Sequence, residues 1–404
     1  MQERPFADQS YWNARFCNFQ RAGGPFINLE SDCGSLGHVF REWLANPQQG
    51  EYWDRQGPTD AEYAGVDVPI LTITGAYDGD QPGALAHYQR HRNHAGAAAE
   101  RHYLVIGPWD HAGTRTPRPE VGGVIFGPNS VIDLIELHRK WYAWTLGGGC
   151  KPDFLRARVA YYVAGADTWK YVDELPDATA AYRELYLSSA HNPSDVFHSG
   201  SLSDEPPELG TPDQYVHDPL GMQSSALERR LGPGRLTDQA LILARRGRQL
   251  VYHSAPFEQE TEITGFFRLL AWIGIDQPDC DISVSVSEVL PDGTSIYLSS
   301  DAVRARYRES LRREMLVATA SPLRYEFNRF MFISRRVRAG SRLRLVIGPL
   351  HSIFSERNFN AGGPVAEESS QSARTVTVRM YHDVSRPSCL YVPLGGAIPG
   401  FDLD

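Results

Sequence analysis

Hydrophobic and polar positions follow three different patterns along the chain, and these patterns divide it into three parts. Residues 1–65 are rich in aromatic residues, glycine and proline, and apolar positions recur at helical spacing over residues 36–44 (LGHVFREWL). We interpret this first part as irregular helices that do not form a separate domain.

Residues 66–150 predict a strand–helix–strand–helix unit. The continuous apolar run 68–74 predicts a strand that is buried on both faces, and residues 101–106 (RHYLVI) predict the next strand. Strands joined through one helix are parallel neighbours. The expected helices span residues 82–92, with Pro82 in the first turn, and residues 131–146, with Ser130 as the cap and Gly147 at the end.

Residues 151–404 predict an all-β sandwich, most simply a jelly roll. Short apolar runs recur between turn signals, of which Pro291-Asp292-Gly293 is the strongest hairpin signal. The polar segment 191–223 is expected to be an ordered loop that crosses between strands. The predicted fold class is therefore α/β plus all-β. The expected strands span residues 159–163, 250–252, 282–289, 295–298 and 343–347.

Charge argues against nucleic acid as the main partner. The chain has 49 acidic and 40 basic residues and a net charge of −9, so a phosphate backbone would be repelled. The densest basic stretch, 304–313, is interrupted by Tyr307, Glu309 and Leu311, and we interpret it as a solvated face.

Cysteine usage and the apolar runs favour a cytoplasmic protein. The five cysteines are scattered without metal-ligand spacing, which is typical of reduced thiols. The first residues, MQERP, lack the apolar segment of a signal peptide, and no apolar run is long enough to span a membrane. We expect no membrane contact, no metal and no cofactor.

Two polar residues follow the two predicted strands of the central part. Asp78 comes after the first strand, in GAYDG, and His111 comes after the second strand, in GPWDHAG. Because the carboxyl ends of neighbouring parallel strands lie at one edge of a sheet, we expect these side chains to meet. Asp before His is also the chain order in α/β-hydrolase triads, where the imidazole takes a serine proton and the carboxylate holds the imidazole.

Each of these residues also has a structural interpretation. Asp78 alone is most simply a turn former or a helix cap, although Asp80 could be the cap instead. His111 alone is most simply a structural histidine. Asp110 could cap a turn or could be the true partner of His111.

Several segments resemble the CocE/NonD family of serine hydrolases, which includes esterases, α-amino-acid ester hydrolases and X-Pro dipeptidyl-peptidases. Residues 66–79 are similar to the family's VPxLxxxGWYD segment, with Ala76 in place of the usual tryptophan. Residues 107–113 are similar to its GPWxHG motif, with Ala112 inserted. Residues 162–169 resemble its MGxxxW entry to the C-terminal β domain, and shorter matches follow in the family's order.

The resemblance implies three domains. They are a helical cap remnant (1–65), the C-terminal part of an α/β-hydrolase domain (66–150), and a galactose-binding-like jelly roll (151–404), as at the C-terminus of X-Pro dipeptidyl-peptidases. It also implies that Asp78 is the triad acid and His111 the triad base. The family's serine and its oxyanion-hole tyrosine precede the cap, so the chain is expected to be the C-terminal portion of such an enzyme.

The nucleophile is the missing element of this interpretation. No Gly-x-Ser-x-Gly motif occurs in the 404 residues. Ser35 in CGSLG lacks only the first glycine, but no clear strand precedes it, so the strained strand-to-helix turn is not expected there, and Cys33 is a weaker substitute. We therefore expect hydrolysis of an acyl ester or X-Pro peptide with a serine from a missing or separate N-terminal segment, and inactivity of this chain alone.

Two other functions stay open. The chain could be an inactive remnant that binds a partner or a small molecule, or a repurposed enzyme that uses His111 and Asp78 as an acid/base pair. The expected partners are a small ester or peptide substrate and an N-terminal hydrolase half or a second copy of the chain. The reason is that two parallel strands alone leave an edge and a face uncovered.

Overall fold

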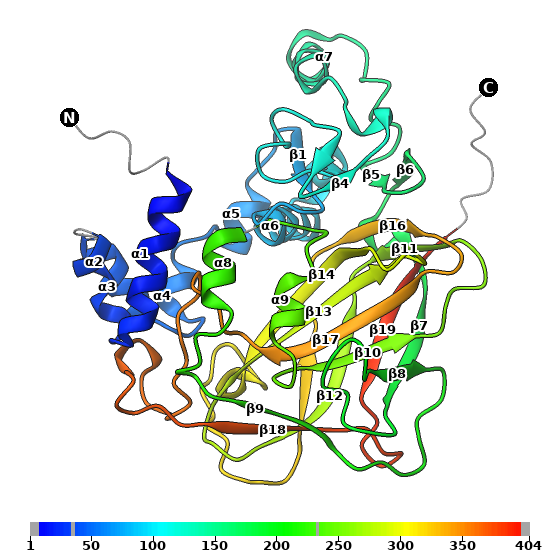
Figure 1. The fold of residues 1–404 in the computed structure, drawn as a ribbon. Coiled ribbons are helices and arrows are strands. Elements are labelled where there is room, and N and C mark those ends of the chain that lie inside the picture. Colours follow the sequence, from blue (N-terminus) through cyan, green and yellow to red (C-terminus); the bar gives the residue numbers. More distant parts are fainter. Residues whose placement is uncertain (1–7, 34–36, 232–233, 397–404) are drawn as a thin grey trace.

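A computed structural model describes residues 8–33, 37–231 and 234–396, apart from the side chains of residues 32 and 33. The N-terminal helices, a small α/β unit and a large β-sandwich follow one another along the chain; in Figure 1 the α/β unit lies above the sandwich and the N-terminal helices lie at its left. Among the described helices, none combines the length and the apolar character that crossing a bilayer requires.

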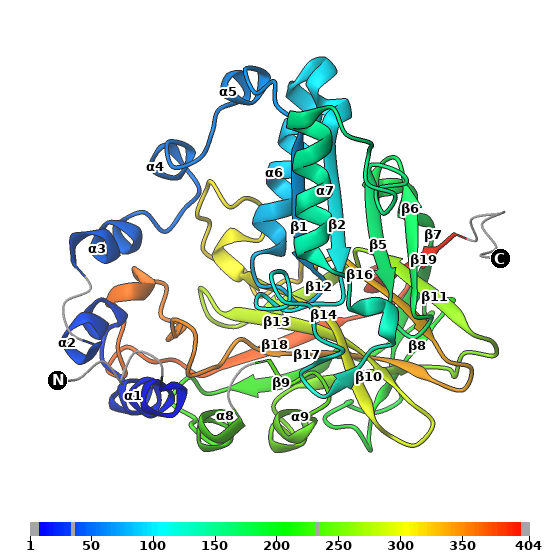
Figure 2. The same ribbon diagram turned by 90° about the horizontal axis from the view of Figure 1, so that it is seen from above.

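The N-terminal helices form an arc beside the α/β unit (Figure 2). Helix α1 (Gln9–Ala22) begins at Asp8, whose carboxylate accepts two backbone N–H groups, and it ends at Gly23, which has a φ of 65°. Helix α3 (Gly37–Ala45) confirms the helix predicted over residues 36–44. The arc is completed by α2 (Leu29–Cys33), α4 (Glu51–Asp54) and α5 (Asp60–Ala64).

The α/β unit contains a sheet of four described strands in the order β1-β2-β5-β6. β1, β2 and β5 are parallel, and β6 is antiparallel to β5. Helices α6 and α7 cover opposite faces of this sheet, because their apolar residues pack in two separate clusters against alternate residues of β2 and β5. The bounds are β1 (Ile70–Gly75), α6 (Gln81–His94), β2 (His102–Gly107), α7 (Leu134–Gly147), β5 (Val159–Val163) and β6 (Thr168–Val172).

Two predictions for this unit are wrong. Residues 159–163 were expected in the sandwich, but β5 pairs with β2, so the sheet has four described strands rather than two. The cap of α7 is Asp133, whose carboxylate accepts the N–H of Glu136, whereas Ser130 bonds within the preceding turn. On the other side of the sheet, β1 has no strand neighbour among the described residues.

The sandwich is built on thirteen described strands, and side chains from β10, β13 and β17 meet those from β12 and β18 in one core. β13 and β14 form the hairpin predicted at Pro291-Asp292-Gly293. The segment 191–223 is not only a loop, because it contains β8 and β9. The jelly-roll topology stays a prediction. The bounds are β7 (Thr179–Ser188), β8 (Gly200–Ser203), β9 (Asp213–His217), β10 (Leu250–Ser254), β11 (Thr261–Gly265), β12 (Arg268–Ile275), β13 (Asp281–Val289), β14 (Ser295–Arg304), β15 (Leu323–Phe327), β16 (Ile333–Val337), β17 (Arg342–Pro349), β18 (Val376–Tyr381) and β19 (Cys389–Gly395).

The basic stretch 304–313 is only in part the solvated face that its composition predicts, because Arg312 and Arg313 are exposed but Arg306 is buried and Arg304 is largely covered. Arg306 is 3% exposed, and its Nε donates to Asp279 Oδ2 at 2.7 Å. Arg304 makes a two-bond contact with Asp281, at 2.8 and 3.0 Å. Buried guanidinium groups need such carboxylate partners, so these arginines are structural.

Candidate active site

Two loops at the carboxyl ends of β1 and β2 are hydrogen-bonded to each other. The Ala76 N–H donates to the Gly107 carbonyl at 2.8 Å, and the Tyr77 N–H donates to the Trp109 carbonyl at 3.0 Å. The turn after β1 then directs Asp78 inward, where it is 4% exposed. Its Oδ1 also accepts the Asp80 N–H at 3.0 Å, which helps to fix the carboxylate.

Glycines allow these loops to approach so closely. A Cβ atom on Gly75 would lie 2.0 Å from the Trp109 carbonyl oxygen, and one on Gly107 would lie 2.3 Å from the Trp109 ring. Trp109 is fully buried, and its Nε1 donates to the Ser130 carbonyl at 2.9 Å. The glycines of the two motifs therefore serve packing around one tryptophan.

Gly75→Ala is expected to destabilise the protein by about 2–3 kcal/mol, because the added methyl meets backbone that cannot move without separating the two loops. Gly79→Ala is the matched control, since a Cβ there meets nothing within 4 Å. Urea unfolding of the two variants measures the difference. Equal stability of the two variants would show that the loops can separate without cost.

His111 lies on the loop after β2 and faces two carboxylates. Its Nδ1 is 3.2 Å from Asp78 Oδ1 and 3.2 Å from Asp80 Oδ2. Carboxylates only accept hydrogen bonds, so the ring proton lies on Nδ1 and the basic nitrogen is Nε2. The side chain is 53% exposed, and Nε2 lies 3.2 Å from the Arg115 Nη2.

The structure brings Asp78 and His111 together, as their positions at the strand ends predict. Asp110 is a turn residue, because its Oδ1 accepts the Gly113 N–H at 2.8 Å. Asp80 occupies the N-cap position of α6 but makes no capping hydrogen bond, and its carboxylate turns to His111 instead. Sequence reasoning missed this second carboxylate, since Asp80 had been considered only as a cap.

Gln81 is a further residue that the sequence did not indicate. It is fully buried, its Nε2 donates to the carbonyls of Gly75 and Phe332 at 3.0 Å each, and its Oε1 accepts the Phe332 N–H at 2.6 Å. These bonds tie the end of β1 to the sandwich. A glutamine in a first helical turn is ordinarily a surface residue, so no local signal marks it.

The same residues are the ones that could hold a cation. One ligand atom from each of Asp78, Asp80 and His111 lies within 4.8 Å of the others. The hydrogen bond from Nδ1 to Asp78 and the ion-pair contact with Asp80 already account for this approach, so a metal is not needed to explain it. As it stands, the arrangement can accept a proton at Nε2 and stabilise the imidazolium that forms.

A nucleophile for this pair is not found among the described residues. Ser35 lies outside them, as does the side chain of Cys33, and no described hydroxyl or thiol hydrogen-bonds to His111 Nε2. Ser189, His382 and Asp213 also lie together in the sandwich. There the serine Oγ (3.3 Å) and the aspartate Oδ2 (3.2 Å) face the same histidine nitrogen, Nε2, so these residues cannot form a proton relay.

The α/β unit places a buried aspartate and a half-exposed histidine at the ends of adjacent parallel strands, and a β-sandwich follows it in the chain. This arrangement defines part of an α/β-hydrolase with an added β domain. Residues 3–113 match the X-Pro dipeptidyl-peptidase (S15 family), and residues 155–352 match the X-Pro dipeptidyl-peptidase C-terminal non-catalytic domain. The chain belongs to the CocE/NonD family of hydrolases.

Individual relatives agree with this assignment. The chain is 25% identical over 362 residues to cocaine esterase of Rhodococcus sp. (strain MB1 Bresler). The aligned region covers 88% of this chain and 61% of that protein. The fold is shared with an aminopeptidase from a marine sediment archaeon, Thaumarchaeota archaeon (TM-score 0.78, 22% identity, 94% of this chain and 63% of that one). It is also shared with an α-amino acid ester hydrolase (TM-score 0.78, 21% identity, 94% and 64%). The chain thus spans less than two thirds of the length of these relatives.

Proposed function

We propose that this chain supplies the acid, Asp78, and the base, His111, of a serine hydrolase that acts on acyl esters or X-Pro peptides. The serine would come from a polypeptide segment outside these 404 residues. The observation that carries the proposal is the 3.2 Å contact between the buried Asp78 and His111 Nδ1, which leaves Nε2 as the basic nitrogen. The relatives, which are an esterase, an ester hydrolase and an aminopeptidase, support the reaction class.

The residues of the chain define their part of the reaction. His111 Nε2 would take the proton from the serine hydroxyl as the oxygen attacks the carbonyl carbon, and would then give it to the leaving group. Asp78 would hold the Nδ1–H and stabilise the imidazolium. Arg115 is exposed on the same loop, so its side chain can leave Nε2 when the serine arrives.

The free edge of β1 supports a place for the serine-bearing segment. The first four residues of β1 (Ile70–Gly75) are only partly buried, whereas every residue of β2 is buried. Strands of parallel sheets are ordinarily covered on both faces. A parallel strand added beside β1 would pair with its free edge, and its carboxyl end would lie at the end of the sheet that holds Asp78 and His111.

The test begins with the DNA immediately 5′ of the Met1 codon, where we expect a segment that encodes Gly-x-Ser-x-Gly. Hydrolysis of p-nitrophenyl butyrate and of alanyl-proline p-nitroanilide is then measured for the 404-residue chain, for the upstream polypeptide and for their mixture. The proposal predicts activity in the mixture only. Saturable hydrolysis by the chain alone would favour a repurposed enzyme, and an inactive mixture would favour a binding remnant.

A further inference from the structure

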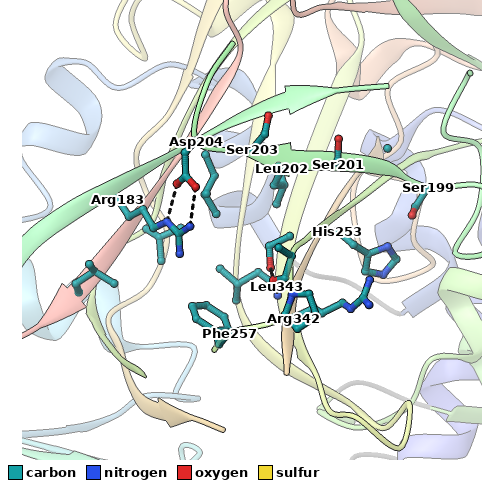
Figure 3. A pocket seen from close by; sticks show the side chains of 17 residues that line it. Arg183, Ser199, Ser201, Leu202, Ser203, Asp204, His253, Phe257, Arg342 and Leu343 are labelled. Atoms are coloured by element: carbon teal, nitrogen blue, oxygen red, sulfur yellow. Dashed lines mark hydrogen bonds and ion pairs between the residues drawn. The ribbon is translucent and has the colours of Figure 1, made fainter. Parts of the chain in front are cut away.

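A cavity of about 480 Å³ lies in the sandwich, and none of the site residues lines it (Figure 3). β8 and β10 pair in parallel and stop at Ser203 and Ser254, next to the longer strands β7 and β17. The chain leaves the sheet at these two ends, so inward-facing side chains become a wall of the cavity. The accessible apolar part of the wall includes Ala255, Pro256, Phe257 and Leu394, and the core residues Leu185, Leu202, Leu343 and Val392 lie behind it.

One end of this cavity is lined by Arg342, and Arg344 lies behind it, outside the lining; neither arginine has a carboxylate partner among the described residues. His253 lies opposite Arg344 in the pairing of β10 with β17, and Arg342 is two residues away on the same strand face. Arg344 is 5% exposed, and its Nε and Nη1 donate to His253 Nε2 (2.8 Å) and Gln239 Oε1 (2.7 Å), both neutral groups. Among the described residues, neither arginine forms an ion pair with an aspartate or glutamate. The charge of the buried Arg344 is therefore not neutralised by a carboxylate, and it adds to the positive charge of the exposed Arg342 at this end of the cavity.

His253 adds a hydrogen-bond donor at the same end. Burial and the two nearby arginines lower the pKa of His253 to about 4, so the ring is neutral at pH 7. Its Nε2 accepts a hydrogen bond from Arg344, so the ring proton must lie on Nδ1. That N–H has no hydrogen-bond partner among the described residues, and the exposed Arg342 beside it also has none.

The opposite end of the cavity is electrically balanced. Arg183 Nε and Nη2 donate to the two carboxylate oxygens of Asp204, at 2.8 and 2.9 Å (Figure 3). The cation excess is therefore confined to the end with His253 and Arg342, and the apolar side chains lie between the two ends (Figure 3). A cavity of this size is typical of small-molecule sites.

We propose that this cavity binds a small amphipathic carboxylate. The carboxylate accepts hydrogen bonds from Arg342 and His253, and the hydrocarbon body packs against Pro256, Phe257 and Leu394. An inorganic anion would leave the apolar wall uncovered, and a neutral hydrocarbon would leave both donors unpaired. Only a ligand with both features matches the whole cavity. This site is independent of the hydrolase reaction.

Isothermal titration calorimetry of the 404-residue chain with 4-phenylbutyrate tests the proposal. Saturable binding is expected, and 4-phenylbutan-1-ol and acetate should each bind about tenfold or more weakly, because each lacks one of the two features. Arg342→Gln should weaken phenylbutyrate binding about tenfold, since it removes a charge-assisted hydrogen bond. Arg374→Gln is the matched control, an exposed arginine that does not line the cavity, and should bind as the unchanged chain does.

Arg342 is exposed, so its replacement leaves the fold intact, and thermal unfolding of the variant verifies this. The proposal is overturned if phenylbutyrate does not saturate, if the alcohol binds as tightly as the carboxylate, or if Arg342→Gln and Arg374→Gln behave alike. Since no hydrolysis is measured, these outcomes do not depend on the proposed catalytic role.

Discussion

Asp78→Asn is expected to lower kcat of the assembled hydrolase by about a thousandfold to ten-thousandfold, while Asp80→Asn lowers it by less than about tenfold. Both carboxylates lie 3.2 Å from His111 Nδ1, so distance does not separate them. Their exposure distinguishes the two carboxylates, because the Asp78 side chain is 5% exposed and the Asp80 side chain is 76% exposed. Water and salt screen an exposed charge, whereas a buried carboxylate holds the imidazole proton on Nδ1 and stabilises the imidazolium.

The measurement is kcat with p-nitrophenyl butyrate for the chain combined with its serine-bearing segment. An asparagine at position 78 can present its amide N–H₂ to the ring and so favour the unproductive tautomer. Far-UV circular dichroism of both variants serves as the folding control. Equal losses for the two variants, or a loss of less than about tenfold for Asp78→Asn, would contradict the assignment of Asp78 as the acid.

Acidification from pH 7 to pH 5 is expected to destabilise the chain by about 4 kcal/mol through the buried histidines His102 and His217 alone. Burial is the chief cause that lowers the pKa of His102 to about 3 and that of His217 to about 4. In the unfolded chain both titrate near 6.5, so below that pH the unfolded state binds more protons than the folded state. The stability is therefore complete above pH 6.5 and is lost as the pH falls toward the folded values. Such a loss is comparable to a large part of the stability of an ordinary domain.

Urea unfolding at pH 7 and pH 5 measures this effect. His102→Gln should reduce the difference between the two pH values. At pH 7 it should also cost stability, because His102 Nε2 lies 2.8 Å from Thr72 Oγ1 and its Nδ1 lies 3.1 Å from His91 Nδ1. His138→Gln, at an exposed histidine of α7, is the matched control and should leave the difference unchanged. Identical stability of the unchanged chain at the two pH values would rule out buried neutral histidines as a source of acid sensitivity.

The central strands and the contact between Asp78 and His111 could be predicted because their signals are local. β1 and β2 are continuous apolar runs that end at Gly75 and Gly107, and a polar residue follows each run. Parallel pairing then places Asp78 and His111 at one edge of the sheet. Neither step needs knowledge of distant parts of the chain.

Other features depend on distant residues and could not be predicted. β5 (Val159–Val163) has the pattern of any buried strand, and only packing decides that its neighbour is β2 rather than a sandwich strand. The arginines of 304–306 look solvent-exposed until Asp279 and Asp281 are brought beside them. The resemblance assigned the roles of acid and base to Asp78 and His111. It did not indicate the contact of the Asp80 carboxylate with His111, because that contact depends on where His111 lies in the fold.

Fluorophosphonate labelling followed by peptide mass spectrometry tests most directly whether acid and base lie in this chain and the nucleophile elsewhere. The label reacts with an activated serine, and His111→Ala removes the base that activates it. The account predicts that the mixture is labelled on the serine of the added Gly-x-Ser-x-Gly segment and that His111→Ala abolishes the label. A label on any serine of the 404 residues, or labelling that survives His111→Ala, would contradict it.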